Sequence, residues 1–369
     1  MPRSRFLSRA AIGSHQARTA LDQTLEAMLA SDLYDPLDGA FFRATLTEDW
    51  RIFVPEKPLA LNALLALTLL ESGRRAEAVR ALDFLLSACS VPGGMLNPCL
   101  TYSRESCAFT PEQVCAALGG EDGLRACRLL GLRRQYAGPP PKVTPSRFSP
   151  VEDAGQTDLP RTPTLPKSLT PEDAAFLRRV MPQLLRVRAA RMPPTAAPCI
   201  LSDCALAAAV FALCGRRLGE SRYIQAAQRA VGYLAALSPG LPPSYTPVSA
   251  LNAQLTCGAG AALALALLTL GQDEALYAYR ESGLRLLGAA LHLFIAPNGM
   301  PMHTPQDSAA FFPRIPAIFD SELPSPAALL LALALADAAA RRPDTRTRRS
   351  SSGRPPRRMR ASSRSPAPG

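Results

Sequence analysis

The feature that most constrains the fold is a plan that recurs three times along the chain. It occurs in "PLALNALLALTLLESGRRAEAVRALDFLLSAC", "DCALAAAVFALCGRRLGESRYIQAAQRAVGYLAAL" and "CGAGAALALALLTLGQDEALYAYRESGLRLLGAALHLFIAPNG". Each segment joins a helix that is apolar on nearly all faces to an amphipathic helix through a turn containing glycine. The first kind must be buried on every side, whereas the second covers a core from outside. Repeated inner–outer hairpins of this kind build a closed ring or a solenoid.

Further helices are predicted around these hairpins. Residues 17–31 form an amphipathic pattern, and "FTPEQVCAALGG" opens with Thr110 as the first residue of a capping box. Thr170 and Ser325 each precede a proline in the same way, and Pro182 is expected to kink the helix that follows Thr170. Aromatic residues make up only 6% of the chain, which disfavours strands, so an all-α fold is predicted.

The composition divides the chain into parts. Residues 15–340 are predicted to form one helical array, interrupted by a proline-rich linker over residues 138–171. Residues 1–14 and the tail, residues 341–369, are expected to be disordered. The tail holds ten arginines and one acidic residue, and therefore most of the net charge of +11. It is either a solvated tail without a role or a basic arm for nucleic acid or anionic lipid.

The remaining chain is nearly neutral, which argues against nucleic-acid binding by the folded part. None of the nine cysteines forms a CxxC motif, and the three histidines are far apart in sequence. No metal site or cofactor is therefore expected, and the cysteines are interpreted as buried free thiols of a reducing compartment. The apolar runs are too short to cross a membrane, so we expect a cytoplasmic protein.

The loop "LYDPLDGAFFRATLTEDW" interrupts the helical pattern and holds the only tryptophan of the chain. Tyr34, Trp50 and two phenylalanines offer flat apolar faces, and Asp35, Arg43 and Glu56 offer hydrogen bonds. Stacking combined with directed polar contacts is typical of carbohydrate binding. The alternative is structural: Asp35 caps a turn, Arg43 pairs with Asp35 or Glu56, and Trp50 packs in the core.

Residues near the C-terminal end supply further candidates. Arg314 and Asp320 are interpreted either as ligand contacts or as an internal ion pair that ties the last hairpin. His303 is the only histidine placed in a predicted loop of the array. Lys57 is interpreted as a solvated residue at the start of a helix.

Two stretches of the chain resemble one known protein family. "TLEAMLASDLYDPLDGAFFRATLTEDWRIFVPEKPLALNALL" and "RIPAIFDSELPSPAA" are similar to motifs of the YyaL-type family, also called thioredoxin domain-containing or spermatogenesis-associated protein 20-like. The matching positions are Tyr34, Asp35, Leu37, Gly39, Phe41, Arg43, Trp50, Val54, Pro55, Glu56, Lys57, Asn62, Leu64, Leu65, Arg314, Asp320, Pro324 and Ser325. The segment "LLRVRAARMPP" also resembles a pattern from the middle of the family's helical region.

This resemblance implies an (α/α)6 toroid of the six-hairpin glycosidase and N-acylglucosamine 2-epimerase superfamily, here incomplete or divergent. Family members carry a thioredoxin-like domain before the toroid, which we do not expect in this chain. The family's two loop histidines align with Pro36 and Phe42, and an acid pair aligns with Ala196 and Ala197. The polar positions of a carbohydrate-type cleft are thus the ones that are lost.

Sugar chemistry on such a scaffold needs placed acids and bases. Epimerisation needs a base and an acid on opposite faces of one carbon. Glycoside hydrolysis needs two carboxyl groups that flank the bond, at about 5–5.5 Å or about 6.5–9.5 Å from each other. The candidate carboxylates are Asp35, Asp38, Asp49, Glu56, Asp203 and Asp320. Two hypotheses follow: a binding or scaffold protein that contacts a carbohydrate or a protein partner, or an active epimerase or glycoside hydrolase with a rearranged carboxylate set.

Overall fold

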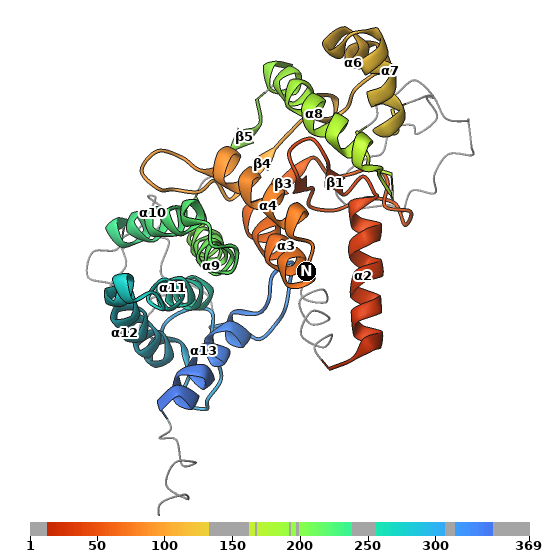
Figure 1. Ribbon diagram of the computed structural model, residues 1–369. Helices are drawn as coiled ribbons and strands as arrows, with labels where there is room; N and C mark the ends of the chain where they lie inside the picture. Colours follow the sequence, from red (N-terminus) through yellow and green to blue (C-terminus); the bar gives the residue numbers. More distant parts are fainter. Residues whose placement is uncertain are drawn as a thin grey trace, which may run out of the picture.

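The computed structural model shows a mostly helical protein (Figure 1), which confirms the predicted helical class. The structure describes residues 13–132, 162–166, 168–191, 193–196, 199–237, 256–306 and 314–341. Nearly all of the predicted N-terminal segment, most of the predicted linker and almost all of the basic tail lie outside these residues. Among the described helices, none combines the length and the apolar character needed to cross a bilayer.

The elements follow one another along the chain in this order. The helices are α2 (His15–Leu29), α3 (Leu59–Glu71), α4 (Arg75–Phe84), α5 (Arg104–Cys107), α6 (Pro111–Leu118), α7 (Gly120–Leu129), α8 (Pro171–Arg191), α9 (Leu201–Leu218), α10 (Ser221–Leu237), α11 (Cys257–Leu270), α12 (Tyr277–Phe294) and α13 (Pro326–Arg341), with a π-helical turn over Leu85–Cys89 and a 3-10 turn over Glu274–Leu276. The strands are β1 (Tyr34–Asp35), β2 (Ala40–Phe41), β3 (Glu56–Pro58), β4 (Cys99–Thr101) and β5 (Thr195–Ala196).

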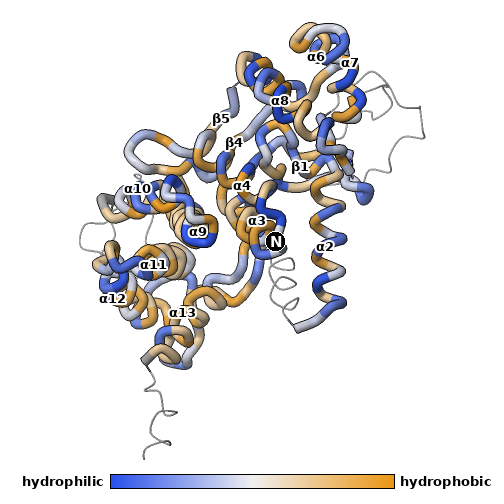
Figure 2. Tube along the Cα trace, viewed as in Figure 1, coloured by the Kyte–Doolittle hydropathy of each residue, from blue (hydrophilic) through white to orange (hydrophobic). Residues whose placement is uncertain are grey.

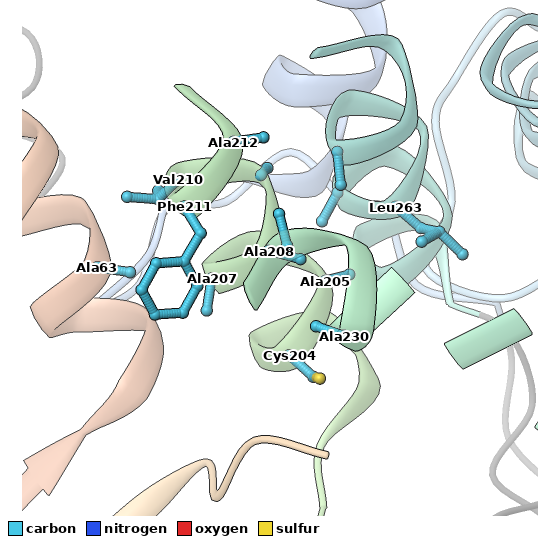
Figure 3. Close-up of a cluster of buried hydrophobic side chains, with 14 of the residues drawn as sticks. Ala63, Cys204, Ala205, Ala207, Ala208, Val210, Phe211, Ala212, Ala230 and Leu263 are labelled. Atoms are coloured by element: carbon cyan, nitrogen blue, oxygen red, sulfur yellow. The ribbon is translucent and has the colours of Figure 1, made fainter. Parts of the chain in front are cut away.

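The three predicted hairpins are confirmed as the pairs α3–α4, α9–α10 and α11–α12. Every residue from Leu59 to Leu69 of α3 is buried, as a helix that is apolar on all faces requires. The inner helices form a row, in which α9 packs between α3 and α11, and α13 packs against α11. Alanines of α9 such as Ala207 and Ala208 lie in this core, close to Ala63 of α3 and Leu263 of α11 (Figure 3). Small side chains let the three helix backbones approach closely.

Two further groups of helices flank the row. Along α2, hydrophilic and hydrophobic residues alternate (Figure 2), and its buried Leu21 and Leu25 share a core with Leu61 and Leu65 of α3. Helices α6, α7 and α8 build a second core of their own, to which α8 contributes Phe176, Val180 and Leu184. The single array predicted from the sequence therefore carries a separate three-helix unit, because the apolar stripe of α8 faces α6 and α7.

The predicted helix starts are confirmed by their side-chain caps. Thr110 Oγ1 accepts a hydrogen bond from the Gln113 amide at 3.3 Å, and Gln113 Oε1 accepts one from the Thr110 amide at 3.0 Å. The hydroxyl oxygens of Thr170 and Ser325 cap α8 and α13 in the same manner, at 3.1 and 3.3 Å. Each cap satisfies an amide that has no partner within its helix.

Short strands, which the sequence analysis did not predict, organise the segment between α2 and α3 and pair it with two later parts of the chain. Strands β1 and β2 pair antiparallel, with Tyr34 opposite Phe41. Strand β4 lies between β3 and β5, and pairs antiparallel with both. Asn62 of α3 holds this segment in place, because its side chain accepts from the Phe41 amide at 2.7 Å and donates to the Phe41 carbonyl at 2.9 Å.

The turn after the first hairpin supplies a test of how it packs on α10. Gly93 and Gly94 have φ angles of +89° and +97°, which residues with a side chain rarely adopt. A Cβ atom at Gly94 would lie 2.3 Å from the Arg229 carbonyl oxygen of α10, whereas nothing lies within 4 Å of one at Gly93. Gly94 therefore carries a steric constraint in addition to the conformational one.

We expect Gly94→Ala to lower the free energy of unfolding by about 2–4 kcal/mol, and the matched control Gly93→Ala by about 1 kcal/mol. Both substitutions destabilise the protein because alanine rarely adopts a positive φ. Only Gly94→Ala also places a Cβ atom against α10. Urea unfolding of the two variants measures the difference. Equal losses would show that this turn does not rest on α10.

Candidate functional site

Four charged side chains meet in the interior between the β1–β2 hairpin, β3 and α8. Asp35 and Asp38 come from the hairpin, Lys57 from β3 and Arg188 from α8. Lys57 Nζ lies 2.6 Å from one carboxylate oxygen of each aspartate, and Arg188 bonds to the same two oxygens, at 2.6 Å for Asp38. The second oxygen of each carboxylate accepts a backbone amide of the hairpin, from Leu37 or Ala40. We call these four residues the ion cluster.

The ion cluster is enclosed by protein. The side chains of Lys57 and Asp35 are fully buried, and those of Arg188 and Asp38 are 3% and 8% exposed. The rings of Phe42, Phe84 and Tyr102 lie 4.7, 5.3 and 4.9 Å from Lys57 Nζ. The prediction that Lys57 is a solvated residue was therefore wrong, because its ammonium group is satisfied inside the protein by two carboxylates and three ring faces.

The electrostatics of the ion cluster hold Asp35 in its charged form. Burial pushes the pKa of Asp35 upward, but Arg188 and Lys57 outweigh that effect and leave the pKa well below its usual range. The charges of Asp35 and Asp38 in turn outweigh burial at Arg188 and raise its pKa. A buried carboxylate with a low pKa cannot donate a proton near neutral pH, and Asp35 is out of reach of a ligand.

The aromatic residues of the loop between α2 and β3 do not fit the carbohydrate-binding alternative. Tyr34, Phe41 and Phe42 are buried, and the ring centroids of Tyr34 and Phe41 are 4.9 Å apart. These rings pack against protein, so they do not offer exposed faces to a ligand. Trp50 is half-buried and packs beside the core that α2 and α3 share, with a φ of +60°. For Tyr34, Asp35 and Trp50, the structural alternative fits the contacts.

Arg43 and Glu56 lie together at a partly exposed site. Arg43 Nε is 2.5 Å from Glu56 Oε2, and a second guanidinium nitrogen of Arg43 bonds to Glu322, which is 279 residues away in sequence. The side chains of Arg43, Glu56 and Glu322 are 31%, 35% and 52% exposed. Asp203 of α9 is close enough to interact electrostatically with both Arg43 and Glu322. We call Arg43, Glu56, Asp203 and Glu322 the Arg43 site.

Strand β3 connects the Arg43 site to the ion cluster. Successive side chains of a strand point to opposite faces, so Lys57 enters the ion cluster and Glu56 the Arg43 site. The third donor of Arg43 contacts Cys99 Sγ on the neighbouring strand at 3.9 Å. Glu322 comes from the segment that leads into α13. The Arg43 site thus joins three parts of the chain that are remote in sequence.

Three carboxylates and one guanidinium give the Arg43 site an excess of negative charge. Burial lowers the pKa of Arg43, but the hydrogen bonds that Arg43 donates to Glu56 and Glu322 outweigh it and raise that pKa. Burial raises the pKa of Asp203, with the Ser202 hydrogen bond and Arg43 opposing this. The site therefore contains carboxyl oxygens that accept hydrogen bonds, and one carboxyl group, that of Asp203, whose proton is more strongly held.

Other predicted site residues have separate roles. Arg314 donates to the carbonyl oxygen of Thr304 at 2.9 Å, and Asp320 accepts from the Ser325 amide at 2.7 Å, just before α13. The predicted Arg314–Asp320 ion pair was wrong, since each side chain is engaged with backbone instead. Asp49 accepts from the backbone amide of Arg51 in its own turn.

The backbone of His303 bonds to that of Cys257 and Ile315, so this residue joins the start of α11 to the segment before α13. Among the described residues, no group of three or more histidine, cysteine or acidic side chains has the arrangement that a metal ion needs.

Sequence reasoning missed Arg188 and Glu322. A signal for Arg188 was present, because it continues the row Phe176, Val180, Leu184 at intervals of four residues. An arginine in the apolar row of a helix indicates a buried ion partner. Glu322 carries no such signal, since only the fold brings it to Arg43.

No family model matches this chain, and no curated protein matches it. The resemblance to YyaL-type proteins therefore stays a prediction that depends on the two quoted motifs.

The ion cluster predicts a contrast between two arginines of α8. Arg188→Met leaves two buried carboxylates with one cation, and we expect it to lower the free energy of unfolding by about 3–5 kcal/mol. The matched control Arg179→Met removes an exposed ion pair with Asp122, and should cost less than about 1 kcal/mol. Denaturant unfolding measures both variants. A loss below about 1 kcal/mol for Arg188→Met would contradict the account of the ion cluster.

Proposed function

We propose that this chain is a binding or scaffold protein on an (α/α)6-type helical array, and that the Arg43 site takes a neutral carbohydrate ligand. A consecutive row of inner helices, each with an outer partner, supports the toroid proposal. Two of the six candidate carboxylates of the sequence, Asp35 and Asp38, are engaged in the ion cluster. Their structural role supports a protein that binds rather than one that catalyses.

The observation that carries the proposal is the Arg43–Glu56–Glu322 arrangement. Glu56 and Glu322 bond to one guanidinium group, which orients both carboxylates while part of each stays exposed. Hydroxyl groups of a sugar are donors that such oriented carboxylates accept. The excess of negative charge disfavours phosphorylated and carboxylated ligands, so neutral or amino sugars fit best.

A second candidate function, a sugar-processing enzyme, is favoured by one observation. Asp203 combines a raised pKa with a position near Glu322 and Arg43. A carboxyl group with a raised pKa beside an ionised one is the arrangement of a general acid and its partner in glycoside hydrolysis. In this alternative Asp203 supplies the proton, and Glu56 or Glu322 acts as the base or nucleophile.

We expect calorimetric titration of the full chain with neutral, amino and phosphorylated sugars to show binding of a neutral or amino sugar. Glu322→Gln should weaken that binding by about tenfold, since a hydrogen bond to a charged group contributes about 1.5–3 kcal/mol. The matched control is Glu48→Gln, an exposed acidic residue outside the Arg43 site, which should bind as the unchanged protein does.

Two outcomes would change this conclusion. Equal or tighter binding of a phosphorylated sugar, or no binding by a protein that unfolds cooperatively, would contradict the proposed ligand class. Product release in the same titrations, lost in Asp203→Asn, would favour the enzyme.

A further inference from the structure

Helix α13 has one apolar side in the core and a second apolar side exposed to solvent. On the inner side, Ala327 and Leu330 are buried in the main core. On the outer side, Leu331 and Leu335 are one turn apart and are 43% and 71% exposed. Four exposed alanines share this outer side, because their spacing follows the helical period. We call the outer set the α13 face: Ala328, Leu331, Ala332, Leu335, Ala336 and Ala339.

The α13 face has the composition of surfaces that are buried elsewhere in the row of inner helices. Alanines such as Ala207 and Ala208 of α9 and Ala264 of α11 are buried within that row. Helix α13 packs against α11 on one side and stands at the end of the row (Figure 1). Among the described residues, no further inner helix follows it. A face suited to close helix packing is therefore left without a helix to pack on.

The segment that leads into α13 extends this apolar surface. The Ala327 amide donates to the Ala317 carbonyl at 3.0 Å, which attaches the segment to the first turn of α13. In this segment Ile315, Ile318 and Phe319 are 58%, 45% and 71% exposed. With the α13 face they present roughly 700 Å² of apolar surface, whereas the largest patch on a typical monomer is about 300–600 Å². Each partner in a stable complex buries about 800 Å², so the area matches one protein partner.

The distribution of charge favours a second copy of the chain as that partner. The α13 face has no charged residue, so two such faces meet without bringing like charges together. Asp320 and Glu322 precede the helix, whereas Arg341 is its last residue. Antiparallel pairing of two α13 helices places the acidic end of each beside the basic end of the other. The same arrangement also opposes the two helix dipoles.

An anionic membrane surface fits the α13 face less well. Helices that lie on a membrane are rich in basic residues along their polar side and in large apolar residues on the other. Within α13, Asp337 and Arg341 are the only charged residues, and four of the six residues of the α13 face are alanines. An alanine offers little apolar area to lipid, but it lets two helices approach closely. The composition therefore favours a helix over a lipid surface.

We propose that this chain forms a homodimer in which the α13 faces of two copies pack antiparallel across a two-fold axis. In such an interface the same patch of both copies is used, so the patch has to be complementary to itself. The uncharged α13 face and the opposite charges at the two ends of the helix meet that requirement. The dimer is independent of the proposed sugar binding, because the α13 face contains no residue of the Arg43 site.

Sedimentation of the full chain over a range of protein concentrations tests this proposal. We expect the mass of the unchanged protein to rise from that of a monomer to that of a dimer. Leu335→Arg places like charges near the centre of the interface, and it should weaken association at least a hundredfold. Leu335 is exposed in the single chain, so the fold should be unaffected, which circular dichroism checks. The matched control Leu124→Arg, at a leucine of α7 that is 53% exposed, should associate as the unchanged protein does.

Mixing two charge variants tests the two-fold geometry. Leu335→Arg and Leu335→Asp should each be monomeric alone and associate when mixed, because the axis brings the two positions near each other. Failure of the mixture to associate would contradict the antiparallel arrangement. A monomer at every concentration, or a dimer that Leu335→Arg leaves intact, would overturn the proposal. A monomer that binds phosphatidylserine vesicles, and loses this binding in Leu335→Asp, would also overturn it and assign the α13 face to a membrane surface.

Discussion

The described structure between α2 and α9 depends on four charges buried in one place. Asp35 and Asp38 bring two negative charges into the interior, and Lys57 and Arg188 compensate them. Removing charges from water costs several kcal/mol for each ion, and only close pairing with satisfied hydrogen bonds offsets that cost. The second carboxylate oxygens are satisfied by hairpin amides, so the ion cluster is complete as it stands. The burial of each of these four charges is therefore stable only while the other three are present.

This constraint determines where the rest of the region lies. Arg188 fixes α8, and with it the three-helix unit of α6, α7 and α8, against the β1–β2 hairpin and β3. Lys57 fixes the orientation of β3, and the alternation of side chains along a strand then directs Glu56 to Arg43. The position of the partly exposed Arg43 site is in this sense a consequence of the buried ion cluster.

The sequence was informative where local patterns decide the structure. The hairpins built on α3, α9 and α11 could be predicted, because a helix without a polar face has to be central. The caps Thr110, Thr170 and Ser325 could be predicted from spacing alone. The short strands could not, since strands of two or three residues carry no periodicity.

Contacts between residues that are remote in sequence were the other feature that the sequence analysis could not predict. Lys57 was predicted to be solvated because its position before α3 is polar in sequence. The two aspartates that pair with it lie about twenty residues away, on a hairpin that no sequence pattern predicted. Glu322 reaches Arg43 only through the packing of the last helix. Arg188 was the one long-range partner that could have been found, from the apolar row in which it stands.

The most direct test of this account is amide hydrogen exchange of the full chain, compared between the unchanged protein, Arg188→Met and Arg179→Met. If the ion cluster joins α8 to the β1–β2 hairpin and β3, Arg188→Met makes exchange in all three elements faster together, by about a hundredfold or more. Exchange in α9, α11 and α12 stays unchanged, and Arg179→Met behaves as the unchanged protein does. Faster exchange confined to α8, with the hairpin and β3 still protected, would contradict the claim that these four charges hold the region together.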